Sequence, residues 1–88
     1  MDRTTPVIVN VSTPEYKKVI IEASDGKRYH SDLTALSKVY CFPKSESEWK
    51  RISVDSTGLA LIWSSRFEAH VDQVIGLATR VEDITKIA

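Results

Sequence analysis

The sequence is poor in the residues that build covalent frameworks, linkers and phosphate-binding loops. Its 88 residues include one cysteine, three glycines and three prolines. A lone Cys41 cannot form an intrachain disulfide, which fits a reducing compartment. The glycines stand singly, which excludes a glycine-rich phosphate loop, and with so few prolines there is no flexible linker.

The chain also lacks net charge and long apolar runs. Twelve basic and twelve acidic residues give a formal net charge of +0, so bulk electrostatics favour neither nucleic acid nor an anionic membrane as partner. No apolar run is long enough to span a bilayer, and the first residues show no signal-peptide pattern. We therefore expect a cytoplasmic protein that does not enter a membrane.

What is present fits one small globular domain. A chain of 88 residues that is 42% hydrophobic and 27% charged can bury its own core. We expect a single domain over residues 1–88, with its core over about residues 6–80. Residues 81–88 are expected to be a tail or an extension of a C-terminal helix.

The clearest local pattern is a hairpin followed by a helix start over residues 19–33. Val19, Ile21 and Ala23 alternate with Ile20 and Glu22, the period of a strand with one apolar face. Asp25-Gly26 is a strong turn signal, and two loop lengths fit it. A three-residue loop of 24–26 places Tyr29 opposite Ile21 and keeps it on the apolar face, so we favour that register.

Further elements follow from apolar spacing and capping residues. Asp32 is placed as an N-cap for a short helix carrying Leu33, Leu36 and Tyr40. Ser45 and Glu48 match a capping box, which predicts one helical turn that carries Trp49 inward. Strands are predicted at residues 7–11, ended by 12–14, and at 16–23, 27–31, 52–54, 59–63 and 66–68.

Near the C-terminus, Val71, Val74, Ile75 and Ala78 have the spacing of an amphipathic helix. Val81, Ile84 and Ala88 continue the same phase. The predicted fold is α+β, with a mostly antiparallel sheet of four to six short strands. Two short helices and the C-terminal helix pack on that sheet.

The pattern resembles the family catalogued as domain of unknown function 2442, over roughly residues 6–78. The matching residues are Pro6-Val7-Ile8, Val19-Ile20-Ile21, Asp25-Gly26, Asp32-Leu33, Trp49-x-x-Ile52-x-Val54-Asp55, Gly58 and Trp63. The chain departs from the family pattern at Ala23, at Ser64-Ser65 and at His70-Val71.

The resemblance implies a small bacterial α+β domain, and its landmarks are structural. It also implies either a component of a two-gene module or the N-terminal half of a helix-turn-helix protein. Because these 88 residues leave no room for a helix-turn-helix, we expect the stand-alone form.

Candidate catalytic and metal-binding residues do not form a recognisable set. His30 is expected on the outer face of the hairpin opposite Ile20, and His70 at a helix start. Neither histidine has the HxH or HxxxH spacing that would supply a second metal ligand. Cys41 has no identifiable base beside it, so we interpret it as a structural thiol. We expect no metal, no cofactor and no enzymatic activity.

Two surfaces are candidates for binding. Trp63 and Phe67, with Arg66 beside them, are possible anchors for a protein partner, although Trp63 closes an apolar strand and fits a core role better. The basic residues Lys17, Lys18, Lys27 and Arg28 are the candidates for contacting nucleic acid phosphates.

We interpret the chain as a non-catalytic protein-interaction or regulatory module. Its expected partner is another small protein, with this chain in the antitoxin-like role of a two-gene module. A homodimer through an exposed strand edge is compatible with so small a domain. The alternatives are an accessory nucleic-acid-binding domain that uses the basic hairpin face and, further, a small enzyme or ligand-binding domain.

Overall fold

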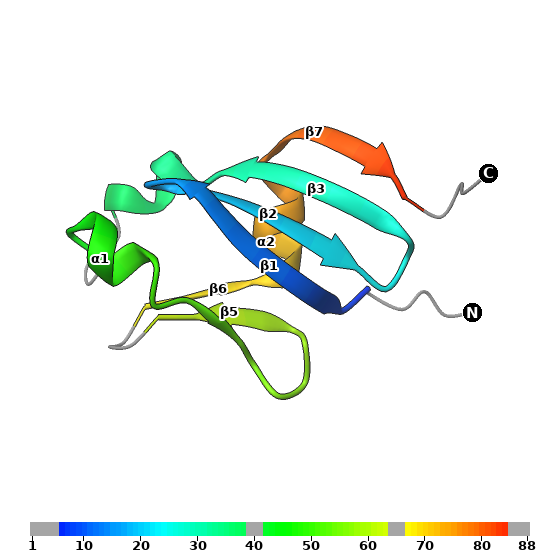
Figure 1. The fold of residues 1–88 in the computed structure, drawn as a ribbon, viewed down its shortest axis with the longest axis horizontal. Coiled ribbons are helices and arrows are strands. Elements are labelled where there is room, and N and C mark those ends of the chain that lie inside the picture. The colour runs from blue at the N-terminus through cyan, green and yellow to red at the C-terminus, as the bar shows by residue number, and fades with distance from the viewer. Residues whose placement is uncertain (1–5, 39–41, 64–66, 85–88) are drawn as a thin grey trace.

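The computed structural model describes residues 6–38, 42–63 and 67–84, and within them seven strands form two sheets (Figure 1). The first sheet has the order β1-β2-β3-β7, and all its neighbouring strands are antiparallel. Its strands are β1 (Ile8–Glu15), β2 (Lys18–Ala23), β3 (Lys27–Asp32) and β7 (Ala78–Asp83). The last strand, β7, joins this sheet only after the helices and the strands of the second sheet have been formed along the chain.

The β2–β3 hairpin has the register that its apolar pattern predicts. Tyr29 pairs with Ile21 and His30 with Ile20. The Gly26 N–H donates to the carbonyl of Ala23 at 3.0 Å, and Gly26 has a φ of 81°, which glycine adopts without a steric penalty. The loop therefore spans residues 24–26, and the apolar residues of both strands share one face.

The first strand runs further than predicted. We expected residues 12–14 to end it, but β1 continues through Pro14 to Glu15. Proline is tolerated there because β1 is an edge strand, where a missing N–H need not break a ladder. Tyr16 and Lys17 make the turn into β2 instead, with Lys17 at a φ of 72°. The strand predicted over 16–23 thus begins two residues late.

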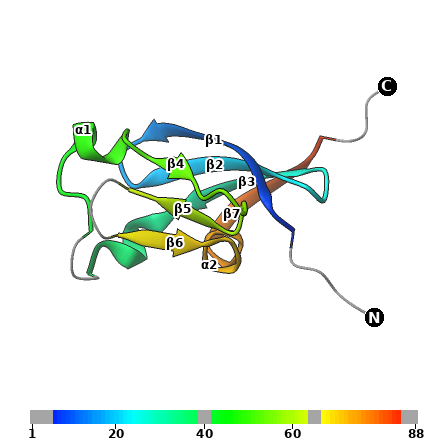
Figure 2. The same ribbon diagram turned by 90° about the horizontal axis from the view of Figure 1, so that it is seen from below.

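The second sheet has the order β4-β5-β6 and is also antiparallel (Figure 2). It contains β4 (Ser53–Val54), β5 (Ala60–Ile62) and β6 (Glu68–His70). The strand predicted over residues 59–63 is the central strand of this sheet, as its apolar pattern indicates, but it is shorter than predicted and covers only Ala60–Ile62. The strand predicted at 66–68 is real but begins at Glu68, and residue 66 lies outside the described part of the chain.

The predicted C-terminal helix is wrong beyond its first turns. Helix α2 covers Val71–Gly76 only, and Ala78, which was assigned to it, begins β7. Val81 and Ile84 do not continue a helical phase; Val81 pairs with Tyr29 in a strand. By forming a strand, β7 pairs with the edge of β3. This pairing between distant segments overrides the helical spacing of the apolar residues. The prediction of one sheet with a terminal helix is therefore replaced by two sheets.

The short helices keep their predicted starts. Leu33–Lys38 is a 3-10 helix, η1, and the Asp32 carboxylate accepts from the Thr34 N–H at 2.9 Å. Helix α1 (Glu46–Trp49) begins after Ser45, whose hydroxyl accepts from the Glu48 N–H at 3.2 Å. The Glu48 carboxylate reaches back to the N–H of Lys44, one residue before the expected cap. Tyr40, assigned to the first helix, lies outside the described residues.

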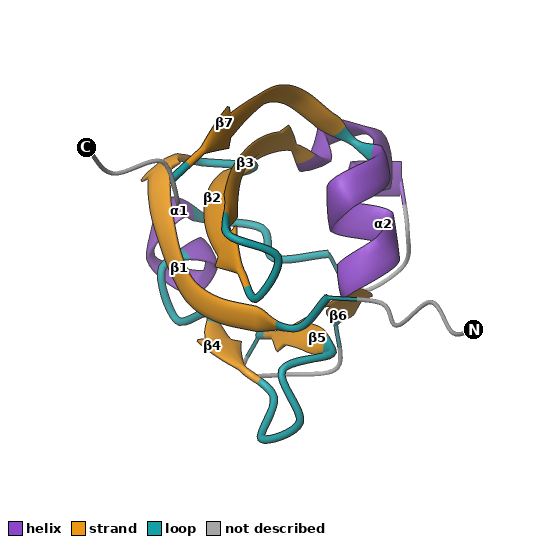
Figure 3. Ribbon diagram, turned by 90° about the vertical axis from the view of Figure 1, so that its right-hand side faces the viewer, coloured by secondary structure: helices purple, strands orange, loops and turns teal. Residues whose placement is uncertain are grey.

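The two sheets enclose one hydrophobic core, with α2 along one side between β7 and β6 (Figure 3). Trp49, Ile21, Leu33, Leu61 and Val74 are fully buried in it. Within the described ranges, every buried side-chain nitrogen and oxygen has a hydrogen-bond partner. The Ser31 hydroxyl, for example, donates to the carbonyl of Val74 at 2.7 Å and ties β3 to α2.

The beginning of the described chain joins the two sheets. The Ile8 N–H donates to the Gly58 carbonyl at 2.7 Å, and the Ser24 N–H donates to the Val7 carbonyl at 2.8 Å. Residues 7 and 8 are thus bonded to the β4–β5 turn on one side and to the end of β2 on the other. The fold combines helix and strand content around a single core.

Candidate functional site

The face of the first sheet that points away from the core carries most of its polar side chains. We call this the outer face, and it contains Lys18, Ile20 and Glu22 from β2, Arg28, His30 and Asp32 from β3, and Arg80 and Glu82 from β7. The alternate residues Val19, Ile21 and Tyr29 are buried on the opposite side. No described helix or strand covers the outer face (Figure 3).

Glu82 is the centre of an ion-pair network on this face. One carboxylate oxygen, Oε1, lies 3.0 Å from His30 Nε2 and 3.3 Å from Arg28 Nη1. The other, Oε2, lies 2.8 Å from Arg80 Nη2. Arg28 also bonds Glu22 through Nη2 at 2.9 Å and through Nε at 3.2 Å, which links β2, β3 and β7 across the sheet.

The network stabilises the charged forms of Glu82 and Arg28. The hydrogen bond from His30, with the nearby cations Arg80 and Arg28, holds the pKa of the Glu82 carboxyl below its usual value. The hydrogen bond to Glu22 raises the pKa of Arg28. Since these side chains are partly exposed, the network orders the surface more than it stabilises the fold.

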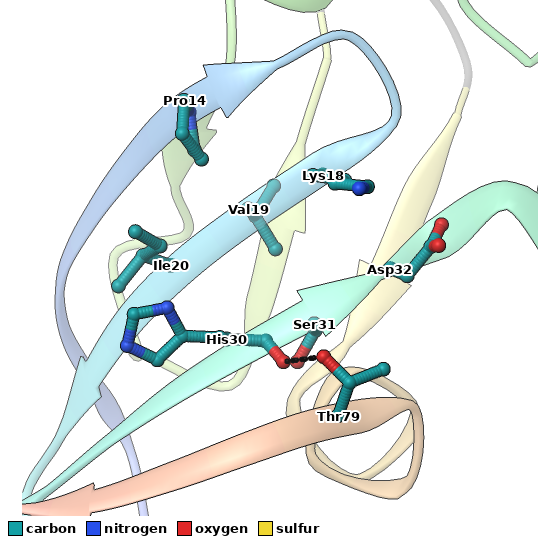
Figure 4. Close-up of a pocket in the computed structure, with 8 residues that line it drawn as sticks. All are labelled: Pro14, Lys18, Val19, Ile20, His30, Ser31, Asp32 and Thr79. Atoms are coloured by element: carbon teal, nitrogen blue, oxygen red, sulfur yellow. Dashed lines mark hydrogen bonds between the residues drawn. The ribbon is translucent and has the colours of Figure 1, made fainter.

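Next to this network lies an open hollow of about 190 Å³ (Figure 4). It is lined by Pro14 of β1, Lys18, Val19 and Ile20 of β2, His30, Ser31 and Asp32 of β3, and Thr79 of β7. Ile20 and His30 lie side by side, as expected from their cross-strand pairing. The hollow therefore presents an aliphatic surface among groups of both charges.

The polar groups around the hollow are held in place by local bonds. The Thr79 hydroxyl donates to the carbonyl of His30 at 3.2 Å, where β7 shifts register against β3. Asp32 accepts bonds from the hydroxyl and the N–H of Thr34, which lower the pKa of its carboxyl. In the strand register, Asp32 lies opposite Lys18.

The four cations proposed for nucleic acid do not lie together. Lys17 and Lys18 are at one end of the β2–β3 hairpin, and Lys27 and Arg28 are at the other. Arg28 is bonded to two glutamates, and Lys18 lies 3.5 Å from the Glu15 carboxylate. The Lys17 ammonium lies 5.2 Å from the centre of the Tyr16 ring. The two basic pairs therefore lie apart, and each has acidic groups beside it.

The two aromatic residues proposed as partner anchors are in the core. Trp63 is 2% exposed and Phe67 is 4% exposed, and their ring centres are 5.1 Å apart. The Trp63 ring also packs against that of Trp49, with centres 4.8 Å apart, and the Phe67 ring meets that of Phe42 edge to face at 4.9 Å. Their assignment as surface anchors is corrected to the core role that was the alternative for Trp63. Arg66 lies outside the described residues.

The remaining candidates form no centre in the described residues. His70 is exposed at the start of α2, 3.5 Å from the Glu68 carboxylate, far along the chain from His30. Among residues 6–38, 42–63 and 67–84, no cluster of three or more His, Cys, Asp or Glu side chains could hold a metal ion. The same ranges contain no helix long and apolar enough to cross a membrane. Cys41 lies outside them.

Sequence reasoning missed Glu82 and Arg80 because they were assigned to a helix extension. It placed His30 opposite Ile20, but Glu82, the side chain that bonds His30, lies 52 positions away in the chain. The alternation of Thr79 and Val81 with Arg80 and Glu82 is the available signal for a strand there. Nothing in that pattern indicates that β3 is the strand it pairs with.

No family model matches the chain, and neither a curated protein nor a solved structure does. The resemblance to the domain of unknown function 2442 stays a prediction from the residues quoted for it.

Proposed function

We propose that the protein is a non-catalytic interaction module that binds a protein partner with the outer face of its first sheet. The observation that carries the proposal is the hollow beside the Glu82 network. A partly exposed aliphatic residue, Ile20, lies there among fixed polar groups, on a face that no described element covers. Protein interfaces have this composition, an apolar centre with a polar rim.

The charges on this face favour a protein over a nucleic acid. Glu22 and Glu82 alternate with Arg28 and Arg80, and Asp32 lies opposite Lys18. A phosphate backbone would approach carboxylates as closely as cations, whereas a protein segment can match both signs. The same pattern of alternating charge would fix the register of the partner.

The narrower form of the proposal makes this chain the antitoxin-like member of a two-gene module, with the neighbouring gene's product as its partner. The support is the resemblance of residues 6–78 to the domain of unknown function 2442. In this form, the outer face would hold the partner in an inactive complex.

Site-specific photo-crosslinking tests the binding face directly. A photoreactive residue is introduced at exposed Pro14, Lys18 or Thr79 around the hollow, and as matched controls at exposed Lys44 and Arg51 near α1. We expect the same protein to be crosslinked in cells from the three hollow positions and not from the controls. Crosslinking from the controls alone, or equally from all five positions, would refute the outer face as the binding surface.

The co-purified material separates the protein from the nucleic-acid alternative. The wild-type chain is recovered at low and moderate salt, and bound protein and nucleic acid are both measured. A protein that stays bound at moderate salt and is lost on Ile20→Lys substitution supports the proposal. Nucleic acid that is released as salt rises, with no protein retained, would establish the alternative use of the basic residues.

A further inference from the structure

Strand β7 ends the first sheet with an open edge. It pairs with β3 on one side, and no described segment lies beyond its other side (Figures 1 and 3). Val81, in the middle of the strand, is 51% exposed. An edge of this kind offers free backbone groups to another strand.

The ladder with β3 shows which backbone groups face outward. The Ile84 N–H donates to the Gly26 carbonyl at 2.9 Å, so the backbone of Ile84 points toward β3. Alternate residues of an antiparallel strand point the same way, so Glu82 and Arg80 also bond β3. Val81 lies between them, and its N–H and carbonyl both point to the open edge.

We propose that the protein forms a two-fold symmetric dimer in which β7 pairs antiparallel with β7 of a second copy, centred on Val81. The two Val81 residues then exchange two backbone hydrogen bonds across the axis. Two four-stranded sheets become one continuous sheet, and the two outer faces lie on the same side. The proposal is independent of the partner proposed for the outer face.

The charges of Arg80 and Glu82 favour the register centred on Val81 over the registers centred one residue to either side. Centring on Val81 places Arg80 opposite Glu82 of the second copy, twice, at a pair of positions where side chains approach closely. Moving the axis to Arg80 would place the two arginines opposite each other. Moving it to Glu82 would place the two glutamates opposite each other. Like charges directly opposite destabilise a strand pair, so of these three registers only the one centred on Val81 is self-complementary.

The other sheet edges are less suited to pairing. Strand β1 contains Pro14 and two register shifts, and its Ile8 N–H is already bonded to Gly58. Strand β4 has two residues and β6 has three, which are too short to template a partner. Strand β7 has six residues and no proline, and its register shift lies at the end near Ala78.

Charge exchange tests the register. The association of the wild-type chain is measured by sedimentation over a range of concentrations, with R80E and E82R alone and mixed. Each variant alone has like charges opposite, so we expect its dimer dissociation constant to rise about tenfold or more. A mixed pair is fully complementary and restores dimerisation. A wild-type chain that stays monomeric up to its solubility limit would overturn the proposal.

Two exposed valines provide a matched pair of edge variants. Val81→Lys places two ammonium groups at the axis and is expected to abolish the dimer. Val9→Lys changes a valine on β1 that is also exposed, at 65%, and is expected to leave the dimer intact. A dimer that V9K dissociates and V81K does not would place the contact at β1 and refute the β7 edge.

Amide hydrogen exchange tests the pairing of β7 on the wild-type chain, without any substitution. The Val81 N–H has no partner within its own sheet, so it exchanges quickly in the monomer. In the dimer it is bonded, so we expect its protection to grow with protein concentration while that of the β2–β3 ladder stays constant. Fast exchange of Val81 at concentrations where the protein is dimeric would exclude β7 pairing, even if every charge variant failed to fold.

Discussion

The indole Nε1 of Trp63 donates a hydrogen bond of 2.9 Å to the backbone carbonyl of Trp49, and the Nε1 of Trp49 donates in turn to the carbonyl of Lys18 at 3.2 Å. The second sheet, α1 and the start of β2 are connected through these two bonds. The rings themselves stack at 4.8 Å. The two tryptophans of the chain therefore combine packing with backbone satisfaction in the core.

Replacing Trp63 by Phe should destabilise the protein more than replacing Trp49 by Phe, although both substitutions remove the same number of atoms. The buried Trp49 carbonyl loses its donor, so we expect W63F to lower the free energy of unfolding by about 2–4 kcal/mol. W49F removes a bond to the less buried Lys18 carbonyl, which water can replace. Denaturant unfolding followed by circular dichroism measures both, and an equal or larger loss for W49F would contradict the ranking.

Gly58 and Gly76 should respond to alanine with opposite signs. Gly58 has a φ of 76°, and a Cβ there would lie 2.9 Å from the Val7 Cβ and 3.2 Å from the Ile8 carbonyl oxygen. We expect G58A to cost about 2–4 kcal/mol, because the added methyl group strains the turn and pushes the two sheets apart. Gly76, in α2, has nothing within 4 Å of a new Cβ. G76A should stabilise by about 0.5–1 kcal/mol.

The matched alanine pair is measured by thermal and denaturant unfolding. If G58A unfolded like the wild type, the close approach of residues 7 and 8 to the β4–β5 turn would not hold in solution.

The Tyr16-Lys17 turn carries a correctable strain. Lys17 is the described non-glycine residue with a positive φ, at 72°. Lys17→Gly relieves the contact of its Cβ with the backbone, and part of that gain is offset by the greater freedom of glycine in the unfolded chain. We expect a net stabilisation of about 0.5–1 kcal/mol in denaturant unfolding. Lys18→Gly, in a regular strand next to it, is the control and should destabilise.

Tyr29 should make the protein sensitive to alkali. Burial, together with the hydrogen bond of 2.5 Å to the Asp25 carboxylate, raises the pKa of the Tyr29 phenol to about 12. A group whose pKa is raised on folding stabilises the fold below its unfolded pKa of about 10 and loses that contribution as pH rises toward 12. We expect the free energy of unfolding to begin to fall above about pH 10.

Tyr29→Phe is the matched variant for the alkaline transition. It removes the ionisable group and keeps the ring, so the decline of stability between about pH 10 and 12 should become shallower than in the wild type. NMR titration of the Tyr29 ring carbons measures the pKa directly, and a value near 10 would contradict the burial of this phenol.

Local sequence was sufficient to predict the elements whose deciding contacts lie between residues close together in the chain. Gly26 determines the β2–β3 loop, and the pairing of Tyr29 with Ile21 results from keeping apolar residues on one face. Ser45 and Glu48 mark the start of α1 and send Trp49 into the core. In each case the deciding contacts lie within a few residues in the sequence.

The elements that were predicted wrongly depend on distant partners. The spacing of Val71, Val74 and Ala78 is helical, and only the free edge of β3 makes a strand of Ala78–Asp83. From the sequence, Pro14 predicts the end of a strand. The strand continues through it because β1 is at the edge of the sheet, which the sequence does not indicate. For the same reason the candidate site was only half visible, because Glu82 joins His30 through a pairing that local pattern does not specify.

The late return of β7 has a consequence for how the protein is made. Strands β1, β2 and β3 leave a ribosome first, but the outer face stays incomplete until the second sheet and α2 have been synthesised. The His30–Glu82 contact closes a loop of about fifty residues, the kind of step that slows folding. A nascent chain therefore exposes the unpaired edge of β3, a site where a chaperone, or another nascent chain, would bind in place of β7.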